Sequence, residues 1–257
     1  ANNTAVGKNA LTDVITGASN TAIGANAIGG ALGAIADNSV GNVAVGKDAM
    51  SGGWANVQTD YCVAIGTGAL TGALNDVDGT VAIGRSALAV LTSGANNLAI
   101  GNSVMASITV GSNNIAVGAF ALDAQVGDGS NASTAGHYNI AIGTAAMGDI
   151  NTHSNSGSVL DKNIAIGTDA LKGASFAGAD INVESNIAIG HQAMDATAAN
   201  PHTGTIAIGG SALTTLTSGA RNTAIGYQAM KLTTSGTDST MIGYNAGYRV
   251  GPGSNYN

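Results

Sequence analysis

The sequence is poor in the residues that stabilise small or conventional globular folds. Of its 257 residues, 1 is cysteine, 2 are proline and 4% are aromatic. The single cysteine, Cys62, excludes an intrachain disulfide, and the scarcity of proline excludes collagen and proline-rich linkers. A conventional core usually contains more large aromatic rings, so we expect a different way of packing.

Charge is also scarce, because charged residues make up 9% of the chain against roughly 25% in an average soluble domain. The net charge is -7, and the 8 Lys and Arg residues are scattered singly. No basic stripe is therefore present for nucleic acid. No apolar run reaches the ~18 residues of a membrane span, and the N-terminus has no signal-peptide pattern. We expect neither a nucleic-acid partner nor membrane insertion.

Glycine, in contrast, is abundant at 39 residues, and much of it belongs to a repeat. Segments such as "NTAIGYQAM" and "NIAIGHQAM" recur, and the Gly of each A-I/V-G serves as an anchor. Successive anchors lie 17 to 25 residues apart in the sequence. The thirteen anchors are Gly7, Gly24, Gly46, Gly66, Gly84, Gly101, Gly118, Gly143, Gly167, Gly190, Gly209, Gly226 and Gly243.

Residues at the same offset from the anchor form columns of constant chemistry. The position before Gly is always Ile or Val (the Ile/Val column), and two before Gly is Ala in all but one repeat (the first Ala column). Four before is mostly Asn (the Asn column); three after is mostly Ala (the second Ala column), and four after is Leu, Met or Ile in all but the last repeat (the Leu/Met column). Alternation before the glycine indicates a strand. We interpret the following x-x-Ala-Leu as a second short strand.

These columns predict an all-β fold, a parallel β-roll or β-solenoid of about thirteen coils over residues 1–247, with 248–257 as a tail or cap. Stacked coils turn each column into a ladder of like residues. We expect the Ile/Val and Leu/Met ladders to fill the interior, and the Asn ladder to occupy a corner where Asn adopts a left-handed conformation. Representative ladder residues are Ile23, Ile65, Ile142, Ile166, Ile225, Asn97, Asn163 and Asn222.

The first Ala column is then predicted to lie on the strand face opposite Ile/Val. Either the coil is thin and Ala fills its second face, or Ala faces a neighbouring chain at close range. The second interpretation predicts parallel chains in register, hence a cyclic oligomer.

The unit N-[TVI]-A-[IV]-G-x-x-A resembles the head repeat of trimeric autotransporter adhesins (Yersinia-type adhesins and haemagglutinins) and the A-I-G-Y repeats of phage and cyanophage tail fibres. The resemblance spans residues 2 to about 247. It implies a left-handed β-roll, a homotrimer and display on the virion surface, outside the cell or on the cell surface. The longer, irregular repeats depart from the adhesin pattern and favour a tail fibre that attaches to a host polysaccharide or protein receptor. A bacterial adhesin head is the alternative.

Insertions follow the Leu/Met column, and the longest cover residues 123–138, 148–161, 173–184 and 195–204. Loops on one side of a solenoid often form its binding face. Aromatic and His side chains next to Asn, Asp and Ser are typical of sugar recognition, although they also pin their own loops. The candidate binding residues are Trp54, His137, Tyr138, His153, Phe176 and His202.

No other motif predicts chemistry. "NDVDGT" (75–80) lacks the spacing and closing Glu of a calcium loop and is interpreted as a turn; His191 occupies a tolerant outward column, and Cys62 replaces Asn in its column and is expected to be buried and inert. We predict no catalytic residue, metal or cofactor. Three further possibilities remain: a polysaccharide-degrading tailspike, a self-assembling extracellular filament, and ice binding through the Thr residues at 4, 21, 223 and 240.

Overall fold

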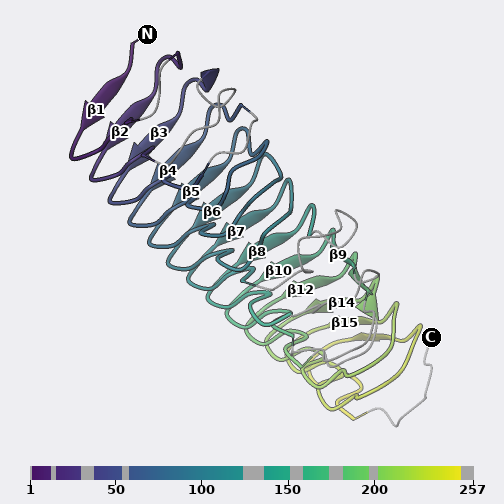
Figure 1. The fold of residues 1–257 in the computed structure, drawn as a ribbon. Coiled ribbons are helices and arrows are strands. Elements are labelled where there is room, and N and C mark those ends of the chain that lie inside the picture. Colours follow the sequence, from purple (N-terminus) through teal and green to yellow (C-terminus); the bar gives the residue numbers. More distant parts are fainter. Residues whose placement is uncertain are drawn as a thin grey trace. The chain divides into compact units, whose positions relative to one another are not determined.

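The chain folds into parallel β-strands, as the repeat predicts. The computed structural model describes residues 2–12, 16–29, 38–53, 58–123, 136–150, 159–173, 182–196 and 202–249, and these contain no α-helix. The chain divides into two compact units, Ala1–Ala119 and Phe120–Asn257. Within each unit, consecutive coils stack as a β-solenoid, which confirms the predicted fold class (Figure 1).

The first unit has one strand per repeat, and each strand pairs in parallel with the next. Ala5 pairs with Ala22 and Ala22 with Ala44, so equal positions of the repeat are in register. The strands are β1 (Thr4–Val6), β2 (Thr21–Ile23), β3 (Val43–Val45), β4 (Val63–Ile65), β5 (Val81–Ile83), β6 (Leu98–Ile100) and β7 (Ile115–Val117).

The second unit continues the pattern and adds a short second sheet. Its repeat strands are β8 (Ile140–Ile142), β10 (Ile164–Ile166), β12 (Ile187–Ile189), β14 (Ile206–Ile208), β15 (Thr223–Ile225) and β16 (Thr240–Ile242). The second sheet contains β9 (Val159–Asp161), β11 (Asn182–Glu184) and β13 (His202–Thr203). These three strands lie at the C-terminal ends of insertions, where the sequence predicts no strand.

The anchor glycines lie over one another within each unit, as the repeat predicts. Their φ angles fall between 129° and 145°, a region that residues with a Cβ rarely adopt. A Cβ on Gly190 would also lie 2.7 Å from the backbone carbonyl carbon and oxygen of Gly209 in the next coil. Glycine is therefore required both by the backbone conformation and by the close approach of the coils.

The prediction of a second strand after the glycine is wrong. The positions two and four after the anchor adopt left-handed conformations, for example Asp48 at φ 57° and Met50 at φ 51°. Asp48 N donates to Ala25 O of the preceding coil at 2.9 Å, whereas Met50 N donates to Ala69 O of the following coil at 2.9 Å. The alternating conformation thus gives hydrogen bonds to both neighbouring coils, and these offset its intrinsic cost of about 1–2 kcal/mol per residue.

The interior is built differently from the prediction. The Leu/Met column is buried as expected, including Met50, Leu70 and Met194. Between the first and the last coil, the first Ala column is also fully buried, as Ala64 and Ala165 show, whereas the Ile/Val column points outward. Ile23, Ile65, Ile142 and Ile166 are 41%, 38%, 38% and 37% exposed, and Ile225 is half-buried. The prediction that the Ile/Val ladder fills the interior is therefore wrong.

Volume explains this inversion. The Leu/Met column and the second Ala column, which includes Ala69 and Ala170, already occupy the interior of each coil. Only a small side chain fits between them and the strand, because protein interiors are close-packed. The first Ala column accordingly faces the chain's own core, and the interpretation that it contacts a neighbouring chain is excluded.

The Asn ladder is confirmed, with one correction to its geometry. Asn97, Asn163 and Asn222 are 2%, 0% and 0% exposed, and each donates a side-chain hydrogen bond of 2.7 Å to a carbonyl of the following coil. The left-handed residue at this corner is the one before Asn, such as Lys162 (φ 58°) or Arg221 (φ 58°). The Asn side chain is thereby directed inward instead of forming the corner itself.

Candidate adhesive surfaces

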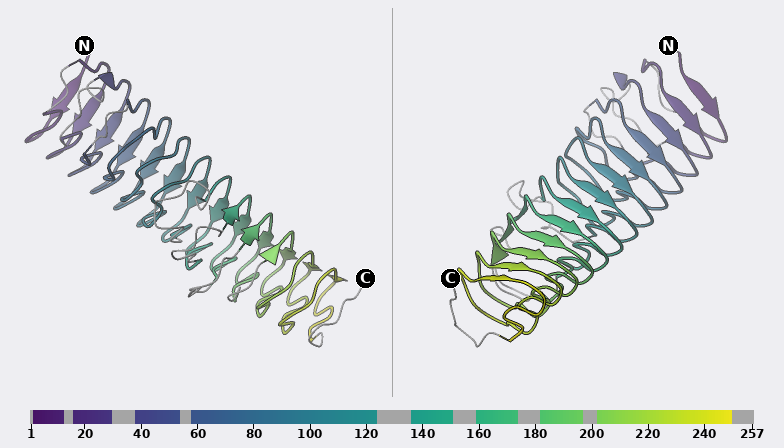
Figure 2. Two further views of the ribbon diagram at one scale, coloured as in Figure 1. Left: turned by 45° about the vertical axis from the view of Figure 1, so that its right-hand side comes forward. Right: turned by 180° about the vertical axis from the view of Figure 1, so that it is seen from behind.

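The outer face of the repeat strands presents aliphatic side chains in every coil. Two of every three strand residues point outward, and they are Ile, Val, Leu or Thr throughout. In the first unit the strands lie in front when the molecule is seen from behind (Figure 2, right). The more exposed members include Val6, Ile100 and Ile115 in the first unit and Ile142, Ile166 and Ile242 in the second.

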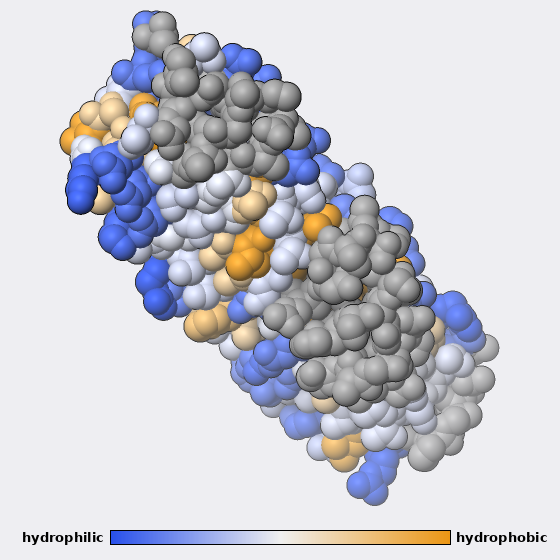
Figure 3. Space-filling view, in the orientation of Figure 1, coloured by the Kyte–Doolittle hydropathy of each residue, from blue (hydrophilic) through white to orange (hydrophobic). Residues whose placement is uncertain are grey.

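This aliphatic face is chemically unlike the other sides of the coils. It carries no charged residue, because none occurs in any repeat strand. In the orientation of Figure 1, the part of the surface formed by the first unit is mostly white and blue, with hydrophobic side chains in a few separate patches (Figure 3). A continuous aliphatic face next to polar surfaces is typical of a protein–protein contact.

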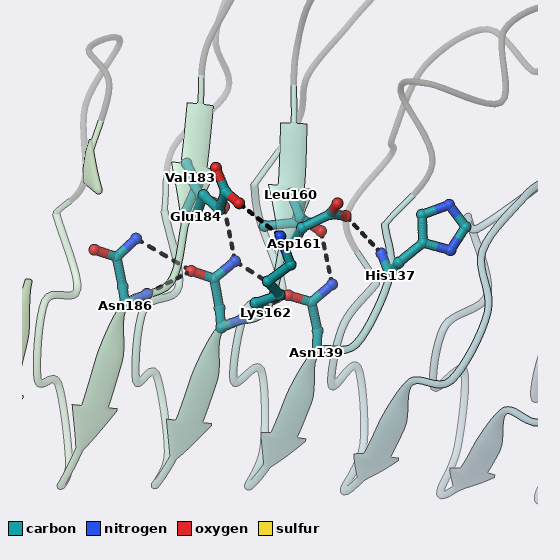
Figure 4. A network of polar contacts seen from close by, with 9 residues as sticks. His137, Asn139, Leu160, Asp161, Lys162, Val183, Glu184 and Asn186 are labelled. Carbon is teal, nitrogen blue, oxygen red and sulfur yellow. Dashed lines mark hydrogen bonds and ion pairs between the residues drawn. The ribbon is translucent and has the colours of Figure 1, made fainter. Parts of the chain in front are cut away.

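A second feature is the polar corner of the second unit, where Asn residues of successive coils are linked (Figure 4). Asn163 accepts hydrogen bonds at Oδ1 from the backbone and side-chain nitrogens of Asn186, both at 3.1 Å. Its Nδ2 donates to Asn139 Oδ1 at 3.1 Å and to Val183 O at 2.7 Å. Such a buried network holds the coils in register, because each amide satisfies backbone groups that burial would otherwise leave unpaired.

Charged groups lie on the outside of the same corner. The backbone N–H of His137 donates to Asp161 Oδ1 at 2.8 Å, and Lys162 Nζ lies 2.8 Å from Glu184 Oε1 (Figure 4). The Glu184 contact raises the pKa of Lys162. Exposed ion pairs contribute little to stability. The Lys162–Glu184 pair therefore makes this surface polar but contributes little to the stability of the fold.

Among the predicted binding residues that the structure describes, His137 and Tyr138 lie together. Tyr138 is 59% exposed and its ring lies 6.3 Å from that of His137, tilted by 47°. Trp54, His153 and Phe176 lie outside the described residues.

His202 is fully buried, so its prediction as a surface binding residue is wrong. It occupies an inward column with Val183, its partner in the neighbouring strand β11, and Leu160, which pairs with Val183 from β9. Its Nδ1 lies 3.1 Å from Gly219 O. Sequence alone does not reveal this role. The other members of the column, Leu160 and Val183, are apolar, so nothing in the sequence indicates that a His lies inside with them.

The weak chemical motifs have structural explanations. Cys62 is buried, its thiol donates to Val77 O at 3.2 Å, and burial raises its pKa to about 12. In "NDVDGT", the Asp78 carboxylate accepts a hydrogen bond from Asp60 N at 2.6 Å and Asp76 adopts a left-handed turn conformation. Among the described residues, no group of three or more His, Cys, Asp or Glu side chains is arranged to hold a metal ion.

Sequence reasoning missed one surface feature, a pair of stacked tyrosines. Tyr227 and Tyr244 directly follow two consecutive anchors, and their ring centroids are 5.8 Å apart with planes 12° from parallel. The signal is present in the sequence, since no other anchor is followed by Phe, Trp or Tyr.

Comparison with known proteins adds no assignment: no family model, curated protein or solved structure matches this chain. No helix long and apolar enough to cross a bilayer occurs in the described part of the chain.

Proposed function

We propose that the chain is a structural and adhesive fibre segment, a phage tail fibre or receptor-binding protein that attaches to a glycan on a host cell surface. The observation that carries the proposal is a solenoid that combines a continuous aliphatic face with insertions at a constant place in the coil. The described flanks of the insertions lie at equivalent positions of successive repeats. Met147 before one insertion corresponds to Leu171 before the next, and Leu160 at the end of one insertion pairs with Val183 at the end of the next. A stiff stack that displays loops in this way is suited to multivalent attachment.

The aliphatic face supports association of copies of this chain, and the resemblance of the repeat favours a trimer. In isolation the face leaves residues such as Ile65 and Ile142 more than a third exposed. Burial of apolar surface contributes about 25 cal/mol per Å², summed over every coil. Because the face is uncharged and regular, parallel copies in register would present equivalent side chains to one another.

Sedimentation of the purified chain tests this association. Val63→Lys places a charge on the aliphatic face, whereas Thr67→Lys places the same charge on the exposed column that already carries Lys8 and Lys47. We expect the wild type and Thr67→Lys to sediment as trimers and Val63→Lys to dissociate. A monomeric wild type at micromolar concentration would refute the trimer.

Attachment through the insertions is tested by shortening one of them. Residues 123–138 connect Leu122 to Asn139, and the equivalent connection from Leu213 to Asn222 needs only residues 214–221. Replacing the former by the latter should leave the circular dichroism spectrum and oligomeric state unchanged and reduce binding to host cells. Unchanged attachment would exclude this insertion as the receptor site.

The head of a bacterial trimeric adhesin is the second candidate, and a polysaccharide-degrading tailspike the third. Flanking sequence distinguishes the first two, because a C-terminal membrane anchor defines the adhesin and a virion-attachment domain the tail fibre. A reducing-end assay on polysaccharide incubated with the protein tests the tailspike. New reducing ends would show hydrolysis instead of simple attachment.

A further inference from the structure

The tyrosine pair of the second unit stands out from the column to which it belongs. The position after the anchor is exposed in the coils of Lys8, Thr67 and His191. Tyr227 and Tyr244 occupy it in consecutive coils and are 52% and 75% exposed. Their rings are parallel and offset, the arrangement that aromatic pairs prefer.

These rings do not serve the core. The interior of the Tyr227 coil is filled by Ala224, Ala229 and Met230, all fully buried. Lys and Thr occupy the same column in other coils, so the fold does not require a ring here. Two adjacent rings left in water expose a large apolar area, which is unfavourable unless a ligand or partner covers it.

The residues next to Tyr227 in the chain and in its column are uncharged. Gln228 Nε2 donates to Tyr227 Oη at 3.3 Å, so an amide and a phenol lie side by side. On the other side, Gly210 precedes Tyr227 in the column, and a Cβ there would approach ring atom Cδ2 to 3.3 Å. The glycine therefore leaves this edge of the ring free of a neighbouring side chain.

No Lys, Arg, Asp or Glu occupies the first two positions after the anchor in the last four coils, residues 191–192, 210–211, 227–228 and 244–245. Earlier coils carry charge in these two positions, including Lys47, Asp48, Arg85 and Asp169. The absence of Lys and Arg from these two positions disfavours an acidic sugar or a phosphate, whose recognition relies on Arg or Lys.

We propose that Tyr227 and Tyr244 bind a neutral carbohydrate, an assignment that rests on the proposed attachment function and names a site for it outside the insertions. The apolar C–H face of a pyranose ring stacks on the exposed tyrosine faces, while the phenol of Tyr227 and the amide of Gln228 bond its hydroxyl groups. Ligand sites commonly combine aromatic walls with a few polar groups of this kind.

The test uses the full chain and a panel of neutral hexose oligosaccharides, with polygalacturonate as the acidic comparison. Binding is measured by saturation-transfer NMR and by a glycan array. We expect the wild type to bind neutral oligosaccharides and not polygalacturonate. The double variant Tyr227→Thr/Tyr244→Thr, with the residue that Thr67 already provides in this column, should bind at least tenfold more weakly, and Tyr227→Phe/Tyr244→Phe should keep part of the binding.

Tyr61→Lys is the matched control, because it removes a tyrosine that is 68% exposed from the column in which another coil carries Lys162. It should leave binding to the oligosaccharides unchanged. Circular dichroism and sedimentation are recorded for every variant.

Three outcomes would overturn the assignment. The Thr double variant could bind neutral oligosaccharides as well as the wild type, or the wild type could bind polygalacturonate alone. The third is dissociation of the oligomer in the Thr double variant, which would place the rings between copies of the chain. If the Thr double variant keeps full attachment to host cells, the tyrosine site is wrong and the proposed function stands. If the wild type attaches to no cell and binds no glycan, the proposed function itself fails.

Discussion

Buried His202 predicts an acid-sensitive point in the second unit. Its side chain is fully buried, and its hydrogen bond to the Gly219 carbonyl requires the proton on Nδ1. Nε2 is then unprotonated and has no hydrogen-bond partner among the described residues. Burial lowers the pKa of His202, whereas the contact with Gly219 opposes this shift. Protonation would place an unpaired charge in the interior, which is strongly unfavourable.

The sign of the pH dependence follows from this shift. In the unfolded chain His202 takes up a proton below its ordinary pKa of 6.5, while the folded chain resists it. Stability is therefore fully present above pH 6.5 and is lost as the pH falls below it. The ceiling, reached when the buried imidazole takes up no proton, is about 1.4 kcal/mol per pH unit, or about 2 kcal/mol at pH 5.

The assay compares the wild type with His202→Leu, since Leu160 occupies the same column. Amide exchange is followed at Gly204, whose N–H donates to Glu184 O at 3.0 Å. Between pH 7 and pH 5, the exchange rate of the wild type relative to the variant should rise by up to about 30-fold, because only the wild type carries the buried imidazole. The raised pKa of Asp195 acts in the opposite direction and is common to both proteins. Identical pH profiles would refute a role for His202.

Three further predictions test the packing. Gly190→Ala should destabilise the chain by more than about 1 kcal/mol in thermal melting, because its φ is 132° and the added Cβ meets the next coil, whereas Gly53→Ala, with nothing within 4 Å, should change stability by less than about 0.5 kcal/mol. Asn163→Ala should cost about 1–3 kcal/mol by leaving backbone groups unpaired, and Lys162→Ala on the exposed side should leave the melting temperature unchanged. Cys62 should not react with a thiol reagent at pH 8 until denaturant unfolds the chain, since its pKa is about 12; reaction at equal rates with and without denaturant would contradict its burial.

The strands, the anchor glycines and the Asn and Leu/Met ladders were predictable from the sequence because each depends on local chemistry. A Gly that must adopt φ near 130° and an Asn that bonds across coils leave little choice of residue at Gly190 or Asn163. The direction of the strand faces was not predictable in the same way. Period-2 alternation separates two faces of a strand but does not say which one is inside.

The misplaced face arose from ranking residues by hydrophobicity alone. By that criterion Ile65 belongs inside and Ala64 outside, whereas the coil interior has room only for Ala64. The deciding quantity is the volume left by residues that lie elsewhere in the same coil, such as Leu70, and it becomes visible only when the chain is closed into a loop. The second sheet was missed for a related reason, because its pairing of Leu160 with Val183 depends on how insertions return to the stack.

In a repeated structure, exceptions within a column carry more information than the column itself. The stacked coils impose the same environment on every member. An unusual residue is therefore either compatible with that environment or present for a reason other than the fold. Cys62 fits, since it is buried and hydrogen-bonded where Asn stands in other coils. His202 fits only in its neutral form, which makes stability depend on pH. The fold does not require Tyr227 and Tyr244, because other coils have Lys or Thr at the position after the anchor. Of these exceptions, the tyrosines are the ones whose physical reason lies outside the chain.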